Sequence, residues 1–297
     1  MQDPSPRASI IIPSYNSRAT IRRCLQSLLA QESDVTHEII LVDSSDDGTD
    51  EIVRSEFPSV RLVHLETRTL PGRGRNLGVQ EARGELLCFT DADCVVEPDW
   101  LNRLTGHLDS GDVAGVGGSV LNGLPQNPVA WCGYLVEFSE YLPSMPPGPS
   151  VLLPTCNAAF RRDVFETLGG FPEELWPAED QIFSWRLVQG GDRLAFDPSI
   201  RVSHLFRPTW GGFLKHQRRL GSASADARRK VPELPGAWIA ESPMRWLTPL
   251  VRWVRIEGRL VRADLPNFLR FNLLLPLVAA GLLYWGAGFC FGPEEGA

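Results

Sequence analysis

Short apolar runs alternate with amphipathic stretches over the first ninety residues. Residues 10–12 and 39–42 are wholly apolar, as expected of strands that are buried on both faces. Residues 18–31 place Ile21, Leu25, Leu28 and Leu29 on one side of a predicted helix, and a second helix is predicted to begin near Arg75. The predicted strands are residues 9–13, 38–42, 60–65 and 86–89. This order of strands and helices predicts an α/β fold whose mainly parallel, Rossmann-like sheet is flanked by helices.

Acidic residues follow two of the predicted strands. Asp43 ends the second strand, and the pair Asp91 and Asp93 comes directly after the fourth. In open parallel sheets, ligands bind beyond the carboxyl ends of the strands. We therefore expect these carboxylates to converge on one edge of the sheet. From Asn102 onward the alternation of strand and helix weakens, and the pattern no longer predicts the sheet order.

The C-terminal region combines arginine with apolar residues. Between residues 245 and 262, arginines recur at spacings of three and four and therefore share one helical face, while apolar residues occupy much of the rest. These arginines are Arg252, Arg255, Arg259 and Arg262. The pattern is typical of a cationic helix on an anionic membrane surface. A helix packed on the domain, with a solvated arginine face, is the alternative.

An uncharged run of twenty residues, 273–292, follows this segment. It is long enough to cross the hydrocarbon core of a bilayer, so it predicts a transmembrane helix. Pro276 and the glycines are tolerable in such a helix. A hydrophobic hairpin or a buried core helix is the alternative. Basic residues before the run and Glu294-Glu295 after it favour a membrane-associated protein with a cytoplasmic N-terminal domain.

Charge and cysteine content narrow the classes of function. The 297-residue chain has a net charge of −7, which argues against nucleic acid as a partner. Residues 201–262 nevertheless carry 13 Lys and Arg against 4 Asp and Glu, so an acidic body precedes a basic segment. The six cysteines show no C-x-x-C spacing, and residues 1–9 lack the apolar core of a signal peptide. We expect a reducing compartment and no disulfide framework.

The Asp91-Ala92-Asp93 loop is a candidate metal site. Two carboxylates this close repel each other, and a divalent cation relieves the repulsion. Mg²⁺ and Mn²⁺ favour one or two carboxylates together with substrate phosphates. A turn or a helix cap is the structural alternative for this short motif. The loop therefore predicts Mg²⁺ or Mn²⁺ as cofactor, held against a phosphorylated substrate.

Five ordered motifs carry a resemblance to a known family. They are Ser9–Asn16 (SIIIPSYN), Val42–Thr49 (VDSSDDGT), Gly74–Gly78 (GRNLG), Asp91–Asp93 (DAD) and Ala178–Asp180 (AED). Their order and spacing resemble those of family 2 glycosyltransferases over roughly residues 8 to 210. The resemblance implies a GT-A fold, a nucleoside-diphosphate sugar donor (we expect a UDP-sugar) and inversion at the anomeric carbon. Together with the C-terminal pattern, it predicts a catalytic domain over 1–225, a basic amphipathic membrane-interface region over 226–267 and a transmembrane or membrane-associated segment over 268–297.

The resemblance also implies roles for single residues. Pro13, Tyr15 and Asp43 would contact the nucleotide base. Such a contact requires an exposed carboxylate, which the end of a strand offers at Asp43. Arg75 and Asn76 would lie near the ribose and diphosphate. Asp91 would reach the ribose, Asp93 would bind the metal, and His204 would complete the metal or diphosphate site. An isolated histidine is equally compatible with a structural role. Asp43, likewise, could instead cap the helix after Gly48, a role that Asp46 and Asp47 fill equally well.

The Glu179-Asp180 pair is the candidate catalytic pair. Transfer to a hydroxyl requires that the hydroxyl lose its proton as it attacks, and a carboxylate opposite the leaving group accepts that proton. Asp180 would be this base, while Glu179 would hold the acceptor or orient the loop. Alternatively, both carboxylates stabilise the N-terminal turn of the following helix.

A basic motif lies further along the chain at Gln217-Arg218-Arg219-Leu220. It is similar to the Q-x-x-R-W signature of processive synthases but lacks its spacing and tryptophan, which argues against processive synthesis. Arg218 or Arg219 would still clamp the donor diphosphate. The predicted membrane segment favours a lipid-linked acceptor or a cell-envelope glycan. A nucleotidyltransferase and a catalytically silent membrane-anchored binding protein are the alternatives; the former lacks the expected basic, glycine-rich loop near the N-terminus.

Overall fold

The computed structural model describes residues 5–292, which divide into two compact units. Residues 5–120 and 146–204 form the first unit, and residues 121–145 and 205–292 form the second. Helix α8 (Trp210–Lys230) continues through residue 225 and helix α10 (Leu265–Leu273) through residue 267. Both boundaries of the expected three-part division thus fall inside helices. The division itself stays a prediction.

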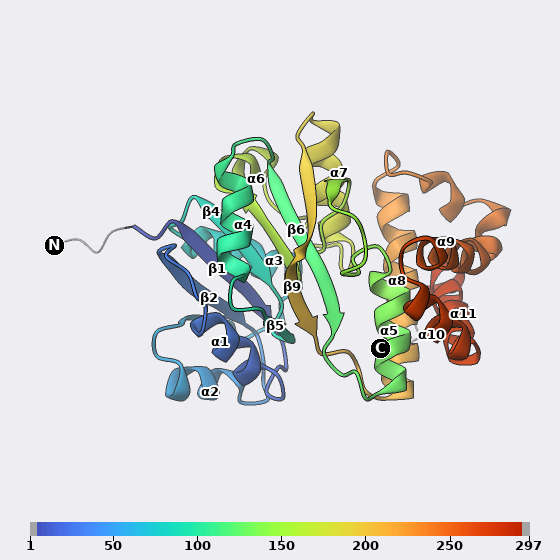
Figure 1. Cartoon of the computed structure of the whole chain (residues 1–297), viewed down its shortest axis with the longest axis horizontal. Coiled ribbons are helices and arrows are strands. Elements are labelled where there is room, and N and C mark those ends of the chain that lie inside the picture. The colour runs from blue at the N-terminus through green and yellow to red at the C-terminus, as the bar shows by residue number, and fades with distance from the viewer. Residues whose placement is uncertain (1–4, 293–297) are drawn as a thin grey trace. The chain divides into compact units, whose positions relative to one another are not determined.

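A nine-stranded sheet forms the centre of the first unit within the described residues, in the order β3-β2-β1-β4-β8-β6-β9-β5, with β7 also paired to β9 (Figure 1). The first four strands pair in parallel, as predicted. Strand β8 then pairs antiparallel with both β4 and β6. The strands are β1 (Ala8–Ser14), β2 (His37–Asp43), β3 (Arg61–His64), β4 (Leu86–Thr90), β5 (Cys94–Val96), β6 (Gly115–Asn122), β7 (Gly148–Ser150), β8 (Asn157–Arg161) and β9 (Leu194–His204). The sheet is therefore mixed, and the expectation of a mainly parallel sheet is wrong for its second half.

The reason lies in the connections between strands. Parallel neighbours require a crossover, usually a helix, whereas antiparallel neighbours do not. The regular alternation of strand and helix is broken after β4. Strand β5 follows β4 directly through the Asp91–Asp93 loop and pairs antiparallel with β9, and no helix lies in the described residues between β7 and β8. The second half of the sheet thus lacks the regular crossovers that a parallel arrangement needs.

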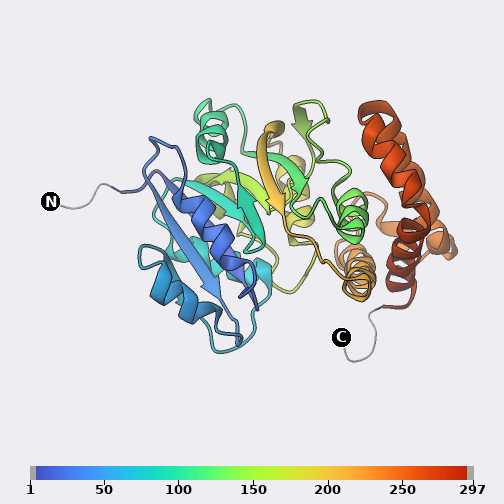
Figure 2. The same cartoon turned by 60° about the horizontal axis from the view of Figure 1, so that its bottom comes forward.

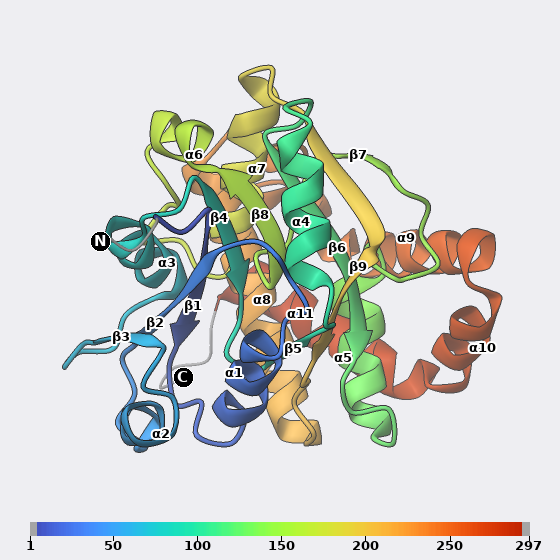
Figure 3. The same ribbon diagram turned by 60° about the vertical axis from the view of Figure 1, so that its left-hand side comes forward.

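Helices cover both faces of this sheet (Figures 1 and 3). On one face, Gly78 of α3 lies directly against Ile11 and Val42, since a Cβ at this glycine would stand 2.4 Å from Ile11 Cγ2. On the other face, the fully buried Trp100 of α4 donates its indole N–H to Asn157 Oδ1 at 2.8 Å. The helices are α1 (Ile21–Leu29), α2 (Thr49–Glu56), α3 (Pro71–Glu81), α4 (Trp100–Asp109), α6 (Arg162–Leu168) and α7 (Glu179–Gln189). The predicted helices over residues 18–31, near Arg75 and at the Glu179-Asp180 pair are confirmed as α1, α3 and α7.

The second unit consists mainly of helices (Figure 2). Its longest pair, α8 and α11, crosses at glycines: a Cβ at Gly221 would stand 1.8 Å from the Trp285 carbonyl oxygen, and one at Gly288 would stand 1.9 Å from that of Arg218. Only glycine permits so close an approach of two helix backbones. The elements are α5 (Pro128–Phe138), α8 (Trp210–Lys230), the 3₁₀ helices η1 (Ala237–Ala240) and η2 (Pro243–Leu247), α9 (Thr248–Ala263), α10 (Leu265–Leu273) and α11 (Leu275–Phe291).

The uncharged run 273–292 does not form the single transmembrane helix that we expected. It is divided between the end of α10 and the 17-residue α11, which meet at Leu274 with an angle of 82° between them. Pro276 occupies the first turn of α11, where its missing N–H leaves no helical hydrogen bond unmade. Within residues 5–292, no single helix has the length and hydropathy of a membrane span, although α10 and α11 together do.

The arginines of α9 do not form one common cationic face either. Arg252 donates to the Val136 carbonyl oxygen at 3.0 Å and lies over the Trp285 ring. Arg259 binds Ser139 and Glu140 at the end of α5. Burial lowers the pKa of Arg252 to about 10. Two of the four arginines therefore bind the protein itself. The expected row of four arginines on a membrane surface is wrong for these two, and so is the alternative of a row in solvent.

Candidate active site

The carboxyl ends of the first strands lie at one edge of the sheet, as predicted. The parallel register places Ser14 of β1 beside Asp43 of β2, and Ile11 beside Phe89 of β4. The residues that follow β1 and β4, Tyr15 and Asp91, therefore leave the sheet at the edge where Asp43 lies. Strand β8 runs in the opposite direction and begins at the same edge, because Asn157 pairs with Thr90.

Arg75 joins two separate acidic motifs at this edge. It lies on α3 and is 2% exposed. Its Nη2 donates to Asp91 Oδ1 and its Nη1 to Glu179 Oε1, both at 2.7 Å. Burial alone would lower the pKa of Arg75, but the adjacent Asp91 and Glu179 outweigh it and raise the pKa, so the guanidinium stays charged. The metal-loop motif and the Ala178–Asp180 motif are thus held together by one buried cation.

The acidic pair begins helix α7. Glu179 is buried, and its second oxygen accepts the Ala178 backbone N–H at 3.0 Å. Asp180 accepts the Gln181 N–H at 2.7 Å and is partly exposed. Burial, followed by the charge of Glu179, raises the pKa of Asp180 to about 7, whereas Arg75 and the Gln181 N–H act in the opposite direction. Asp180 is therefore a carboxylate that exchanges its proton near neutral pH.

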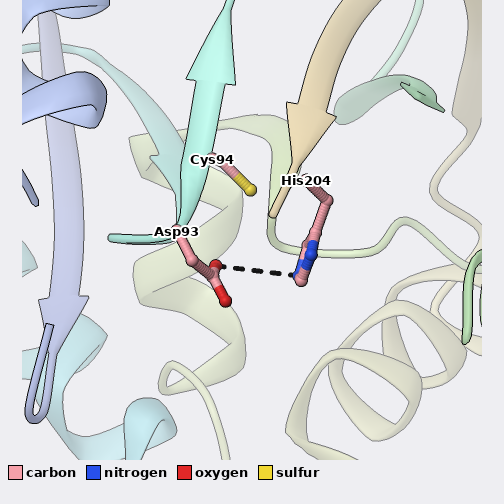
Figure 4. Close-up of side chains that lie close together, drawn as sticks. All are labelled: Asp93, Cys94 and His204. Carbon is pink, nitrogen blue, oxygen red and sulfur yellow. Dashed lines mark ion pairs between the residues drawn. The ribbon is translucent and has the colours of Figure 1, made fainter. Parts of the chain in front are cut away.

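Asp93, Cys94 and His204 gather where β5 begins and β9 ends (Figure 4). Cys94 and His204 are paired residues of these antiparallel strands. One ligand atom from each of the three lies within 4.8 Å of the others, and His204 Nε2 is 3.7 Å from Asp93 Oδ1. A carboxylate and an imidazole at this separation are suited to share one divalent ion after a small rearrangement, since bonds of about 2.1 Å place neighbouring ligands roughly 3 Å apart.

Cys94 is the member of this group that the sequence did not indicate. Its only signal was its place directly after Asp93. Burial, reinforced by a hydrogen bond with Cys156, raises the pKa of the Cys94 thiol well above its usual value. A buried neutral thiol is a poor ligand for the oxygen-preferring Mg²⁺ and Mn²⁺. Asp93 and His204 are therefore the better-suited ligands of the three.

Asp43 is held differently from what its position suggested. Its side chain is fully buried rather than exposed. Oδ1 accepts the Ser45 hydroxyl at 2.6 Å, and Oδ2 accepts the Ser45 N–H and lies 3.1 Å from His64 Nδ1. The expectation of an exposed carboxylate is wrong because the turn after β2 and the end of β3 close over it. Its expected contact with a nucleotide base stays a prediction.

Asn76 also has protein partners. Its Nδ2 donates to the Phe171 carbonyl oxygen at 2.9 Å and to Glu173, and its Oδ1 accepts the Phe171 N–H at 2.9 Å. A side-chain amide satisfied in this way acts as a clamp on the loop before α7. Asn76 thus holds the segment that leads to Glu179 and Asp180, and its expected contact with the donor stays a prediction.

Pro13 and Tyr15 flank the end of β1. Pro13 lies beside Gly74, the residue before Arg75, since a Cβ at this glycine would stand 3.4 Å from Pro13 Cβ. Tyr15 is 40% exposed, and the Arg68 guanidinium lies 4.5 Å from the centre of its ring. Arg68 was not indicated by the sequence, because the loop between β3 and α3 carries no readable motif. Arg68 thus lies over one face of the partly exposed Tyr15 ring, as in a cation–π pair.

Arg218 lies in the second unit. It belongs to α8, and its Nε donates to the Gly292 carbonyl oxygen at 3.3 Å. The residues brought together in the first unit are Arg75, Asp91, Asp93, Glu179, Asp180 and His204. The expected clamp of Arg218 or Arg219 on the donor stays a prediction.

Comparison with known proteins identifies the family. The family model described as "Glycosyl transferase family 2" matches residues 9–169. Glycosyltransferase AglE of Haloferax volcanii is 30% identical over 225 residues, covering 73% of this chain and 72% of that protein. Succinoglycan biosynthesis protein ExoO of Rhizobium meliloti is 30% identical over 214 residues, covering 66% of this chain and 60% of that protein.

Solved structures show the same fold. Mannosyltransferase PcManGT from Pyrobaculum calidifontis, in complex with GDP-Man and Mn²⁺, aligns with a TM-score of 0.63 at 22% identity, covering 98% of this chain and 88% of that one. S. aureus TarS aligns with a TM-score of 0.55 at 20% identity, covering 95% and 54%. The α/β fold with its mixed sheet is thus GT-A-like. Together, the family model and the relatives confirm the resemblance: the chain belongs to glycosyl transferase family 2 and is a glycosyltransferase.

Proposed function

We propose that this glycosyltransferase moves a sugar from a nucleoside-diphosphate sugar, expected to be a UDP-sugar, to a hydroxyl group with inversion at the anomeric carbon. The observation that carries the proposal is the buried Arg75, which donates to Asp91 and Glu179 at 2.7 Å each. These bonds place Asp180 near the Asp91–Asp93 loop. Relatives named for succinoglycan biosynthesis and for O-antigen chain rhamnosyl transfer support a glycan acceptor, either lipid-linked or in the cell envelope.

Asp180 is the proposed general base. The acceptor oxygen forms a bond to the anomeric carbon as the bond to the diphosphate oxygen breaks, and the acceptor proton passes to the Asp180 carboxylate. A base is most effective when its pKa lies near the working pH, and the pKa of Asp180 is raised to about 7. Glu179 engages Arg75 and the Ala178 N–H with its two oxygens, so we assign it the orientation of the loop rather than a contact with the acceptor.

Asp93 and His204 are the proposed ligands of Mg²⁺ or Mn²⁺. When bound, the ion would neutralise charge on the departing diphosphate. The neighbour solved with GDP-Man and Mn²⁺ supports a divalent ion in this fold. Tyr15 offers its exposed face to the base by stacking, and Asp91, with its side chain 29% exposed, remains reachable for the ribose. The further donor contacts proposed from the resemblance are those of Pro13, Asp43, Arg75, Asn76 and Arg218.

A donor panel tests this proposal. Purified protein is incubated with Mn²⁺ and a series of nucleotide sugars, and the released nucleoside diphosphate is measured, since slow donor hydrolysis occurs without acceptor. We expect release with one donor class, its loss in Asp180→Asn, and retained donor binding in that variant. With inorganic pyrophosphate added, conversion of the nucleotide sugar to a nucleoside triphosphate and a sugar 1-phosphate would identify a nucleotidyltransferase, and binding with no release from any donor would indicate a silent binding protein. Either result would contradict the proposal.

A further inference from the structure

A stripe of apolar side chains on α9 faces solvent. Leu250, Val254 and Val261 are 51%, 58% and 53% exposed. At about 100° per residue these three positions fall within an arc of roughly 40°. Exposed apolar residues also occur on both sides of the stripe along the chain: Trp246 and Leu247 in η2, and Leu265, Leu269 and Leu273 in α10. We call these exposed residues of η2 and α9 the apolar stripe: Trp246, Leu247, Leu250, Val254 and Val261.

The stripe is not a core face that has merely lost its cover. Helix α9 already packs against its own unit through a different side, where Ile256 and Leu260 are buried. Arg252 and Arg259 lie on that packed side, bound to the segment 136–140. The helix thus carries one apolar side that is packed and a second that is in solvent. Exposed apolar side chains gathered on one side of a helix favour an interaction site.

The charges around the stripe select its partner. Arg255 and Arg262 are exposed and lie roughly 100° to 120° to one side of the stripe centre, whereas the half-buried Glu257 lies about 40° to the other side. Helix α9 contains four arginines and one glutamate, and residues 205–292 carry 13 Lys and Arg against 5 Asp and Glu. A second copy of this chain would bring the same positive charge to the contact. An anionic lipid bilayer offers both an apolar interior and negative headgroups.

We propose that the apolar stripe lies in the surface of an anionic bilayer, with Arg255 and Arg262 at the level of the headgroups. The apolar side chains enter the boundary of the acyl chains, while the arginines keep their stems beside them and their charges in the polar layer. This assignment differs from a row of four arginines on the membrane, because Arg252 and Arg259 are turned inward. It also goes beyond the proposed transfer reaction, since it needs no substrate.

Vesicle co-sedimentation of the full chain tests the surface. The protein is mixed with vesicles of phosphatidylcholine, with and without phosphatidylglycerol, in the absence of any sugar nucleotide. We expect binding to the anionic vesicles, weakened about tenfold or more by Val254→Glu or Leu250→Glu, because each places a charge in the apolar layer. The matched control is Leu29→Glu on α1, a leucine 47% exposed outside the stripe, which should bind as the unchanged protein does.

The arginines are tested in the same assay. Arg255→Gln should weaken binding to the anionic vesicles about fivefold and leave the weak binding to phosphatidylcholine unchanged, whereas Arg23→Gln, an exposed arginine of α1, should change neither. Trp246 should shift its fluorescence to shorter wavelength on the vesicles, and Trp246→Phe should remove that component. Circular dichroism establishes that each variant is folded.

Three outcomes would overturn the proposal. They are failure of the unchanged protein to bind anionic vesicles, equal binding by the folded Val254→Glu variant, and a dimer in sedimentation equilibrium that Val254→Glu separates while vesicles remain unbound. Diphosphate release from a nucleotide sugar is measured separately on the same preparations. Loss of the surface and loss of the transfer activity are therefore distinguishable.

Discussion

Replacing Asp180 by asparagine should stabilise the protein while abolishing transfer. The carboxylate has an ordinary pKa of 3.8, and in the folded protein its pKa is raised to about 7, mainly by burial and by the charge of Glu179. A raised pKa means that the folded state binds the proton more tightly than the unfolded chain does. The stability contributed by this proton is therefore fully present below about pH 4 and is lost as the pH rises through about 7.

The magnitude follows from the difference between the two pKa values. Each pH unit of that difference corresponds to about 1.4 kcal/mol, so the upper limit is about 4 kcal/mol. Asp180 is partly exposed, and solvent screening reduces this to roughly 1–3 kcal/mol. For a unit of this size, 1 kcal/mol shifts Tm by about 2–4 °C. Asparagine keeps an oxygen for the Gln181 N–H but carries no charge, so it removes the penalty without removing the hydrogen bond.

The assay is thermal unfolding of the unchanged protein and of Asp180→Asn across pH. We expect the variant to have a Tm several degrees higher at about pH 8 and the same Tm at about pH 4. Asp34→Asn, a change at an exposed carboxylate, is the control and should show no pH-dependent difference. A variant with the same Tm as the unchanged protein at both pH values would contradict this prediction. So would a variant whose Tm exceeds that of the unchanged protein only in acid.

Three further predictions concern the residues around this carboxylate and the glycine crossing of the second unit. Arg75→Met leaves the buried Glu179 without its cation and should cost about 3–5 kcal/mol; the double change with Glu179→Met should recover most of this in denaturant unfolding, and a double variant no more stable than the single one would contradict the pairing. Asp93→Ala should abolish the Mn²⁺-dependent part of nucleotide binding in calorimetry while leaving metal-independent binding in place; an unchanged Mn²⁺ dependence would exclude Asp93 as a ligand. Gly288→Ala should destabilise the second unit by about 1–3 kcal/mol, because its Cβ would stand 1.9 Å from the Arg218 carbonyl oxygen; wild-type stability in thermal unfolding would show that α8 and α11 can separate freely.

Local sequence patterns specify the first half of the sheet and the edge where the acidic residues lie. The apolar runs at residues 10–12 and 39–42 are strands because a wholly apolar run must be buried on both faces. Helices between successive runs then require parallel pairing. The carboxyl ends of β1, β2 and β4 share an edge as a consequence, which places Asp43 and Asp91 there. These features follow from residues close together in the chain.

Contacts between distant segments set the partner of each side chain in the site. Arg75 contacts Glu179, which lies 104 positions further along the chain, and no local pattern encodes that contact. Asp43 is buried because Ser45 and His64 close over it. Cys94 joins Asp93 and His204 because β5 pairs with β9.

The same distinction holds for the second unit. Helical periodicity shows which residues of α9 share a face, but it does not show which face packs inward. Arg252 and Arg259 turn inward because the segment 136–140, more than a hundred residues earlier, supplies a carbonyl, a hydroxyl and a carboxylate for them. The uncharged run after residue 273 likewise bends at Leu274 and packs on α8 through glycines. Local sequence sets the conformation and the pattern of each element, whereas the choice of the surface that it buries depends on shape and charge that distant segments contribute.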